Sequence, residues 1–261
     1  MHARDKIKAL LVDLDGTVYN GETLVDNLAP SFFKKAYKTG LPYLFVTNRA
    51  HRKAKTIVQQ LRALDIPVRA EQVLTSAVAT TDYLKPAKAY VIGEEGLINP
   101  LLSRGFKITS DEPDYVIVGF DRTLTYEKID TASRLIRAGS SFIATNTDSL
   151  VAATADRHEP GNGAAVAAIE FASGVKAEVI GKPNPIIFDM AIQRLKCQDL
   201  PRSSICMIGD NPSTDICGAV NSKLQAAWLT QDESAQLWQE WQNVNIVKNY
   251  QELSELVFSE K

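Results

Sequence analysis

Short apolar runs alternate with amphipathic segments along most of this chain. Residues 9–12 (Ala-Leu-Leu-Val) form an unbroken apolar run, and residues 42–46 and 204–208 have a similar character. Such runs are typical of parallel strands that are buried on both faces, and helical spacing of the apolar residues between them predicts intervening helices. The alternation therefore predicts an α/β fold with a parallel sheet and right-handed crossovers.

The predicted elements follow this alternation through the chain. Strands are expected at residues 9–12, 42–46, 89–92, 115–118, 141–144, 177–180, 204–208 and 226–229. Helices are expected near residues 30–40, 53–64, 76–86, 97–102, 126–138, 164–172 and 186–195. Asn20-Gly21 predicts a tight hairpin, whereas the polar segment 148–162 predicts a long irregular loop. The C-terminal segment, with Trp228, Trp238 and Trp241, is expected to close the core without contributing chemistry.

Acidic residues follow two of the predicted strands directly. Asp13 and Asp15 come after the first strand, and Asp210 and Asp215 come after the strand at 204–208. Ligands bind beyond the carboxyl ends of strands in open parallel sheets, and buried carboxylates need a compensating partner. Each aspartate also has a structural interpretation, because Asp is an ordinary turn residue and a helix N-terminus favours a carboxylate such as Asp215.

Two further polar motifs lie at predicted strand ends. Lys182 stands between a glycine and a proline at a strand-to-helix turn, where a fixed ammonium can reach a site, although most lysines are solvated surface charges. Thr47 and Asn48 follow the second strand, and their side chains can donate to phosphate oxygens. The alternative for Thr47 is that it caps the next turn. Residues 145–148 repeat the Thr-Asn pattern without an Asp-x-Asp pair, which favours an ordinary strand exit.

Four carboxylates without neighbouring cysteine or histidine favour a hard cation, and Mg²⁺ fits best. Mg²⁺ is commonly bound by one or two carboxylates together with waters and phosphate oxygens, so the pattern indicates phosphoryl transfer. Asp13 is the expected nucleophile, which forms an aspartyl-phosphate, and Asp15 is the expected general acid and base. Mg²⁺ and Lys182 would neutralise charge on the transferred group.

Composition narrows the classes of protein further. The chain has 29 Lys and Arg against 31 Asp and Glu, a net charge of −2, which provides no basic field for nucleic acid or an anionic membrane. No apolar run approaches the roughly 18 residues that span a bilayer, and we expect neither a membrane segment nor a signal peptide. Three cysteines without metal-site spacing suit a reducing compartment, so a cytoplasmic location is expected. Three scattered histidines argue against a zinc site or a Ser-His-Asp triad.

Four motifs, in order, resemble those of the haloacid dehalogenase-like hydrolases. They are Asp-Leu-Asp-Gly-Thr at 13–17, Thr-Asn at 47–48, Gly-Lys-Pro at 181–183 and Gly-Asp followed by Thr-Asp within 209–215. The phrases around the last three are similar to the NagD-like, p-nitrophenylphosphatase-type branch of that family. The resemblance implies a Rossmann-like, doubly wound core at residues 1–82 and 177–261, with an inserted α/β cap at residues 83–176.

The resemblance also implies roles for single residues. Asp13 and Asp210 would bind Mg²⁺ through their side chains, and Asp15 through its backbone carbonyl. The expected phosphate-binding residues are Thr47, Asn48 and Lys182, and the expected supporting residues are Asp215 and Asn211. The implied substrate is a small-molecule phosphate ester, such as a sugar phosphate or a nucleoside monophosphate, with p-nitrophenyl phosphate accepted in vitro. A homodimer is implied as well.

Two features depart from the family pattern. Many relatives have Asn-Ser or Asn-Asn-Ser after the threonine, whereas this chain has Asn-Arg-Ala-His at 48–51, and its loop after Asn146 is shorter. Both features concern substrate choice rather than the chemistry. The candidate residues for that choice are Arg49, Asn146, Asp148 and Asn162.

Two other classes of function remain open from the sequence. A phospho-aspartate receiver or switch also uses clustered aspartates and a lysine on a doubly wound sheet, but it needs neither Asp15 as an acid and base nor a cap. A protein that binds a phosphorylated metabolite without turnover would use the same groups. Release of inorganic phosphate separates both from a phosphatase.

Overall fold

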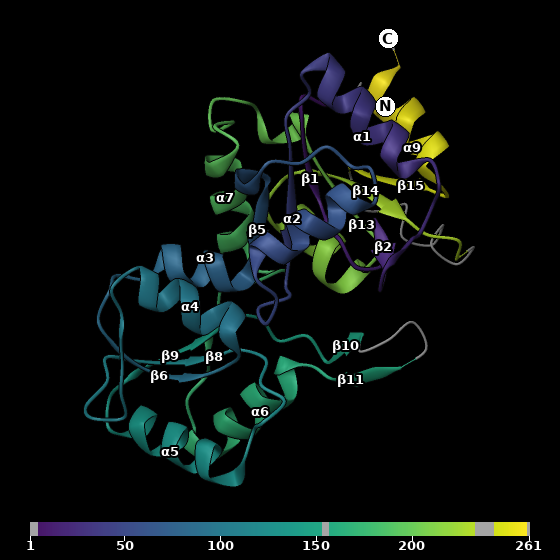
Figure 1. Ribbon diagram of the computed structural model, residues 1–261. Helices are drawn as coiled ribbons and strands as arrows, with labels where there is room; N and C mark the ends of the chain where they lie inside the picture. The colour runs from purple at the N-terminus through teal and green to yellow at the C-terminus, as the bar shows by residue number, and fades with distance from the viewer. Residues whose placement is uncertain (1–4, 153–156, 233–242, 260–261) are drawn as a thin grey trace. The chain divides into compact units, whose positions relative to one another are not determined.

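The computed structural model describes residues 5–152, 157–232 and 243–259, and the chain divides into two compact α/β units (Figure 1). The first unit comprises residues 1–46, 55–74 and 182–261, and the second comprises residues 47–54 and 75–181. The predicted cap, residues 83–176, falls within the second unit. The exact domain bounds given above stay a prediction.

The first unit is built on a six-stranded sheet in the order β15-β14-β13-β1-β4-β5. The strands are β1 (Ala9–Val12), β4 (Tyr43–Thr47), β5 (Val73–Thr75), β13 (Ile205–Gly209), β14 (Gln225–Leu229) and β15 (Val244–Val247). β1 pairs in parallel with both β4 and β13, and the pairs continue in parallel through β14 to β15. From β1, the chain adds β4 and β5 on one side of the sheet, and it then adds β13, β14 and β15 on the other side. The strand order therefore reverses between β1 and β13, and ligands bind at such a switch point in open parallel sheets.

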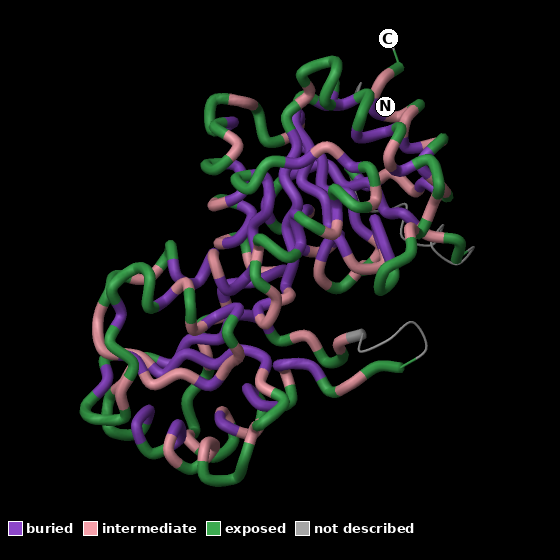
Figure 2. The backbone as a smooth tube through the Cα atoms, viewed as in Figure 1, coloured by how far each residue is buried: buried purple, intermediate pink, exposed green. Residues whose placement is uncertain are grey.

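The central strands are buried at every position, as the continuous apolar runs predicted. All residues of β1, β13 and β14 are buried, and the same strands are coloured as buried in Figure 2. Val12 pairs with Ile208, and the Asp13 backbone N–H continues the ladder by donating to the Ile208 carbonyl at 2.9 Å. The residues that follow β1 and β13 therefore leave the sheet at the same edge.

Two of the helices of the first unit pack against each other through aromatic side chains. The helices are α1 (Ala29–Thr39), α2 (Ala54–Ala63), α7 (Pro185–Arg194), α8 (Cys217–Asn221) and α9 (Tyr250–Phe258). Helix α1 ends at Gly40, which takes the left-handed conformation at φ 69° that favours glycine. The Phe32 ring of α1 lies 5.5 Å from that of Tyr250 and 5.4 Å from that of Phe258, both in α9. The predicted hairpin at Asn20-Gly21 is confirmed as β2 (Tyr19–Asn20) and β3 (Thr23–Leu24).

The second unit has its own parallel sheet, in the order β12-β9-β8-β6-β7. The strands are β6 (Lys88–Ile92), β7 (Lys107–Ile108), β8 (Tyr115–Val118), β9 (Ser141–Ala144) and β12 (Glu178–Val179). Figure 1 shows α3 (Ser76–Tyr83) and α4 (Glu95–Ser103) on one side of this sheet, with α5 (Tyr126–Arg137) and α6 (Asn162–Ser173) on the other. Val116, Leu135 and Ile169 join β8, α5 and α6 in one apolar core.

The prediction of an irregular loop at 148–162 was wrong in part. The segment contains a two-stranded antiparallel hairpin, β10 (Leu150–Ala152) and β11 (His158–Pro160), in which Val151 pairs with Glu159. Each strand has three residues and every residue of β11 is at least partly exposed, so no alternation of apolar and polar residues marked the hairpin. Of the three C-terminal tryptophans, Trp238 and Trp241 lie outside the described residues.

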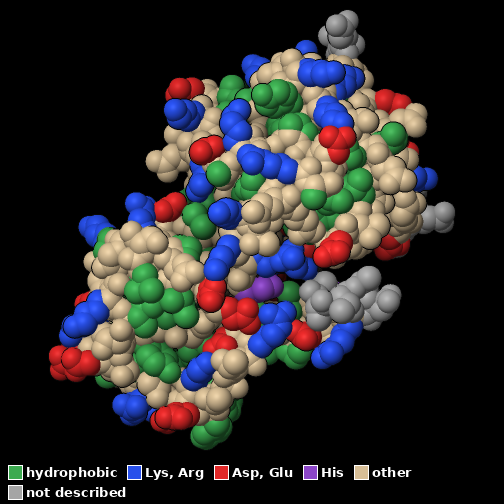
Figure 3. Space-filling view, in the orientation of Figure 1, with side chains coloured by type: hydrophobic (Ala, Val, Ile, Leu, Met, Phe, Trp, Pro, Cys, Tyr) green, Lys and Arg blue, Asp and Glu red, His purple; other side chains and the backbone are tan. Residues whose placement is uncertain are grey.

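Charges of both signs are mixed on the surface. On the face drawn in Figure 3, the described Lys and Arg side chains are interspersed with Asp and Glu. Among the described residues, no helix has the length and apolar character needed to cross a membrane. The charge pattern agrees with the small net charge of the sequence.

Candidate active site

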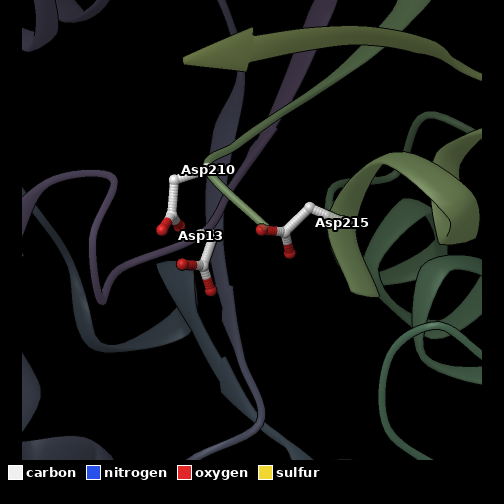
Figure 4. Close-up of side chains that lie close together, drawn as sticks. All are labelled: Asp13, Asp210 and Asp215. Atoms are coloured by element: carbon white, nitrogen blue, oxygen red, sulfur yellow. The ribbon is translucent and has the colours of Figure 1, made fainter. Parts of the chain in front are cut away.

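Three aspartates converge at the edge of the first sheet where β1 and β13 end. Asp13 follows β1 directly and Asp210 follows β13, while Asp215 comes from the short helical turn η3 (Pro212–Ile216). Figure 4 shows their carboxylates close together, and one oxygen of each lies within 4.8 Å of the others. The prediction from the strand ends thus places Asp13 and Asp210 correctly beside each other, and Asp215 joins them.

The turn after β13 positions Asp215. The Asn211 side chain caps η3 by accepting a hydrogen bond from the Ser213 backbone N–H at 2.9 Å, and the Asn211 N–H donates to Asp215 Oδ2 at 3.2 Å. Gly209 leaves room for this carboxylate, because a Cβ atom there would lie 2.3 Å from Asp215 Oδ2. Asn211 therefore holds the turn that carries Asp215, and its supporting role in the chemistry stays a prediction.

Lys182 is a buried partner of two of these aspartates. Its Nζ donates to Asp13 Oδ1 and, at 2.6 Å, to Asp215 Oδ1, and the residue is only 2% exposed. Burial alone lowers the pKa of a lysine, but the two carboxylates outweigh it and hold the pKa of Lys182 above its usual value. The interpretation of Lys182 as a solvated surface charge is therefore wrong.

The three carboxylates carry more negative charge than Lys182 balances. Burial, and then the neighbouring Asp13, raise the pKa of Asp210 to about 6, against the opposing effects of Thr17 and Lys182. Burial also raises the pKa of Asp215, although Lys182 favours its ionised form. With all three aspartates ionised and Lys182 protonated, two negative charges remain. A divalent cation would neutralise them.

The donor set itself fits a hard divalent metal ion. The described ligand atoms are carboxylate oxygens of Asp13, Asp210 and Asp215, without a cysteine or histidine among them. Oxygen-only sites of this kind suit Mg²⁺, Ca²⁺ or Mn²⁺ rather than the metals that prefer thiolate or imidazole. Asp15 contributes no carboxylate oxygen to this cluster.

The loop that carries Asp15 is folded tightly against Asp210. Gly16 has φ +83°, and a Cβ atom on it would lie 2.2 Å from Asp210 Oδ2. The Gly16 N–H donates to the Tyr19 carbonyl at 3.0 Å, which closes the turn after β1. Only glycine meets both requirements without displacing the carboxylate. The metal-binding and acid–base roles of Asp15 stay predictions.

Three residues without a predicted role support the cluster. The buried Thr17 hydroxyl donates to Asp210 Oδ1 at 3.0 Å, and the same oxygen lies 3.4 Å from Asp13 Oδ2, which can share its single proton. The Tyr250 hydroxyl donates to the Thr17 carbonyl at 3.1 Å, and the Trp228 indole N–H donates to the Asp210 carbonyl at 2.9 Å. Thr17 belongs to the first motif, but Trp228 and Tyr250 carry no local sequence signal. The C-terminal segment therefore supports the site through these two hydrogen bonds to backbone carbonyls.

Thr47 and Asn48 belong to the second unit, where both are buried. Thr47 ends β4, and its Oγ1 accepts from the Arg49 backbone N–H at 3.1 Å, which is the capping interaction expected as the alternative. The Asn48 side-chain amide donates to Asp148 Oδ1 at 2.8 Å. The backbone carbonyl of Asn48 accepts from the Asn146 side-chain amide, also at 2.8 Å. The phosphate-binding role of Thr47 and Asn48 stays a prediction.

The predicted candidates for substrate choice are connected inside the second unit. Asn162 donates to the Asn146 carbonyl at 2.7 Å, and the Asp148 N–H donates to Asn146 Oδ1 at 3.2 Å. Asn146 and Asn162 are both almost fully buried. These hydrogen bonds fix the segment that follows β9 and the start of α6. Such bonds are what an ordinary strand exit would have. Any effect of these residues on substrate choice stays a prediction.

Comparison with known proteins identifies the family. Residues 10–107 match the haloacid dehalogenase-like hydrolase family and residues 179–253 match a HAD-hydrolase-like family. The acid sugar phosphatase of Staphylococcus saprophyticus and the 5'-nucleotidase YutF of Bacillus subtilis are each 39% identical over 220 residues. The alignments cover 82% of this chain and 83% and 84% of those proteins. The chain belongs to the haloacid dehalogenase-like hydrolases.

Solved structures agree on the branch of that family. A double mutant of the thermostable NPPase from Geobacillus stearothermophilus has a TM-score of 0.85 at 34% identity, and 99% of each chain is covered. NagD from E. coli has a TM-score of 0.85 at 28% identity, with 98% of this chain and 99% of NagD covered. These neighbours confirm the NagD-like, p-nitrophenylphosphatase-type resemblance and the Rossmann-like core.

Proposed function

We propose that this protein is a phosphatase that hydrolyses small-molecule phosphate monoesters, with Mg²⁺ as its metal ion and an aspartyl-phosphate as its intermediate. The observation that carries the proposal is the cluster of Asp13, Asp210 and Asp215 around Lys182 at the switch point of the sheet. Relatives named acid sugar phosphatase and 5'-nucleotidase support the reaction class. Sugar phosphates and nucleoside monophosphates are therefore the first substrates to examine.

Asp13 is the nucleophile in this proposal. Lys182 orients its carboxylate through the hydrogen bond to Oδ1, so that the other oxygen can attack the phosphorus atom of the ester. The bond from phosphorus to the ester oxygen breaks as the bond to Asp13 forms. Asp15 donates its proton to the departing oxygen, and the alcohol product is released.

The second half-reaction restores both aspartates. A water molecule attacks the phosphorus of the aspartyl-phosphate, and the ionised Asp15 takes a proton from that water. The acyl–phosphate bond breaks, inorganic phosphate is released and Asp13 is again a carboxylate. Asp13 and Asp210, together with the Asp15 carbonyl, would hold the Mg²⁺ ion, which when bound supplies positive charge to the phosphate oxygens. Asp215 holds Lys182 in place by accepting a second hydrogen bond from its Nζ.

Thr47 and Asn48 are proposed to bind the phosphate. A hydroxyl that accepts from the Arg49 N–H can still donate its own proton, so the observed cap leaves Thr47 competent for this role. Thr47 is the last residue of a strand at the carboxyl edge of the sheet, which is the position expected for a ligand contact.

Chemical trapping tests the nucleophile directly. The enzyme is mixed with substrate and quenched with borohydride, which reduces an aspartyl-phosphate to homoserine, and the modified peptide is located by mass spectrometry. Homoserine is expected at position 13. Asp13→Asn should abolish phosphate release with the fold retained, whereas Asp65→Asn, an exposed control in the same unit, should behave as wild type. Trapping at another residue, or turnover by Asp13→Asn, would overturn the assignment.

A further inference from the structure

Tyr250, at the start of α9, contacts both ends of the segment that carries the β2–β3 hairpin. We call residues 17–26 the hairpin segment. The Tyr250 hydroxyl donates to the Thr17 carbonyl at 3.1 Å, and the Tyr250 backbone N–H donates to Asp26 Oδ2 at 2.9 Å. One residue near the C-terminus therefore holds the beginning and the end of a segment that follows Asp13 by only a few residues.

Packing and a helix cap fix Tyr250 itself. The residue is 1% exposed, and its ring centroid lies 5.5 Å from that of Phe32 and 6.0 Å from that of Phe33, both in α1. Asn249 caps α9 by accepting from the Glu252 backbone N–H at 2.9 Å. A side chain that packing already holds loses little further conformational entropy when it forms a hydrogen bond. Tyr250 is therefore a rigid anchor for the hairpin segment.

The hydroxyl distinguishes Tyr250 from a residue that only fills the core. A phenylalanine would supply the same ring contacts, whereas a buried hydroxyl costs free energy unless it forms a hydrogen bond. Burial, followed by Asp26 and Asp13, raises the pKa of Tyr250, so the hydroxyl stays protonated at neutral pH and can donate. Its acceptor is the backbone carbonyl of Thr17, which is a fully buried residue. The hydroxyl thus adds a directed contact to the packing of the ring.

The hairpin segment is closed by its own hydrogen bonds and held at its tip. The Val25 backbone N–H donates to the Val18 carbonyl at 3.0 Å, and Gln60 of α2 donates to the Gly21 carbonyl at 2.6 Å. A two-stranded hairpin is only marginally stable in isolation, so contacts to its ends and tip determine how firmly it keeps its position. Two of these contacts come from Tyr250.

Thr17 connects this anchor to the carboxylates of the site. Its hydroxyl donates to Asp210 Oδ1 at 3.0 Å, and the same oxygen lies 3.4 Å from Asp13 Oδ2. Threonine is branched at Cβ and has a stiff χ1 angle, so fixing the backbone of Thr17 also fixes the direction of its hydroxyl. A residue that holds the Thr17 carbonyl therefore acts on both aspartates through Thr17.

We propose that Tyr250 is a positioning residue for the metal site, which holds both ends of the hairpin segment, keeps the Thr17 hydroxyl on Asp210 and thereby increases the affinity of the site for Mg²⁺. This inference rests on the proposed function, which supplies the metal ion. All of these residues belong to the first unit. Loss of one neutral hydrogen bond typically changes an equilibrium constant by about threefold to tenfold, which sets the size of the expected effect.

A double-mutant cycle, measured by titration calorimetry with Mg²⁺, tests this route. Tyr250→Phe keeps the ring and removes the hydroxyl, and it should weaken Mg²⁺ binding by about threefold to tenfold. Thr17→Val keeps the shape of the side chain, removes the donor to Asp210 and should weaken binding at least as much. In the Thr17→Val background, Tyr250→Phe should have little further effect, because the hydroxyl that it positions is gone. Unchanged affinity in Tyr250→Phe, or its full effect in that background, would overturn the proposal.

Tyr43→Phe is the matched control in the same unit. Tyr43 is also buried, its ring centroid lies 5.5 Å from that of Phe33, and its hydroxyl donates to a backbone carbonyl, that of Pro67. This variant should lower the melting temperature to an extent comparable with Tyr250→Phe and leave the affinity for Mg²⁺ unchanged. An equal loss of Mg²⁺ affinity in both variants would show a general effect of packing and would also overturn the proposal.

Hydrogen exchange in EDTA separates this inference from the proposed function. The backbone N–H groups of Gly16, Val18 and Val25 form hydrogen bonds in and beside the hairpin segment and report its order without metal. Tyr250→Phe should increase their exchange rates by about threefold to tenfold, whereas Tyr43→Phe should not. Unchanged rates in Tyr250→Phe would count against the role of Tyr250 alone. Faster exchange together with a wild type that binds no Mg²⁺ would count against the metal-dependent function alone.

Discussion

Lys182→Met offers the sharpest test of the electrostatics at the site. Lys182 is 2% exposed and contacts both Asp13 and Asp215, and methionine keeps much of the length of the side chain while removing its charge. Without the ammonium, two buried carboxylates face each other with Asp210 close by. In the absence of metal, the described donors that remain are neutral, namely the Thr17 hydroxyl and the Asn211 backbone N–H.

The expected loss of stability follows from the buried geometry. Removing one partner of a buried ion pair costs about 3–5 kcal/mol, and the two contacts of Lys182 place this variant near the upper end at neutral pH. In the wild type, folding raises the pKa of Lys182. Its contribution to the free energy of unfolding is therefore complete at any pH below the ordinary pKa of lysine, and it is lost only as the pH rises through the raised pKa. Burial raises the pKa of Asp210 and Asp215, and the variant lacks the ammonium that opposes this effect, so these two carboxyl groups keep their protons to a higher pH when folded than when unfolded. The penalty must therefore decrease as the pH falls.

Urea unfolding in EDTA, followed by circular dichroism at pH 7.5 and pH 5, measures both quantities. Lys34→Met removes an exposed lysine of the same unit that pairs with Asp65, and it should cost only about 0–1 kcal/mol at either pH. Adding Asp215→Asn to Lys182→Met should restore part of the lost stability. A loss for Lys182→Met that is no larger than that of Lys34→Met, or that is equal at the two pH values, would refute the reasoning.

Three further predictions concern the metal site. Gly16→Ala should destabilise the protein by about 1–2 kcal/mol, because residue 16 has a left-handed backbone conformation. The new methyl group also displaces Asp210, so Mg²⁺ binding measured by calorimetry should be abolished, and normal affinity would contradict this. Trp228→Phe removes the indole donor to the Asp210 carbonyl and should weaken Mg²⁺ binding by about tenfold or less, and an unchanged dissociation constant would contradict the supporting role. The rise in melting temperature caused by Mg²⁺ should be larger at pH 7.5 than at pH 5. Burial raises the pKa of Asp210 to about 6, and this carboxyl group must lose its proton to bind the ion. Equal rises at the two pH values would argue against Asp210 as a ligand.

Local sequence patterns predicted the main features of the fold and part of the site. Buried apolar runs identified β1 and β13, and the rule that parallel strands end at one edge placed Asp13 beside Asp210. The setting of Lys182 between a glycine and a proline indicated a fixed side chain, and its burial confirms this. These predictions succeeded because each strand and each turn is marked by residues adjacent in the chain, and the pairing of parallel strands then brings the strand ends together.

Features that depend on distant contacts were not predictable in the same way. Trp228 and Tyr250 support the cluster through single hydrogen bonds to backbone carbonyls about 18 and 233 residues away, for which the sequence contains no local signal. The strands of the β10–β11 hairpin are too short and too exposed to show a hydrophobic period. The contact between the His51 and Phe120 rings is brought about by folding alone, and no local pattern in the sequence predicts it.

Phosphate release from a panel of sugar phosphates, nucleoside monophosphates and p-nitrophenyl phosphate, measured with Mg²⁺, with EDTA and after Mg²⁺ is restored, tests the central claim most directly. We expect release in Mg²⁺, loss of release in EDTA and recovery when the ion is returned, with at least one physiological ester among the substrates. Absence of release from every ester by the folded, Mg²⁺-loaded protein would contradict a phosphatase and favour a switch or a binding protein. Release that is unaffected by EDTA would contradict the metal-dependent mechanism.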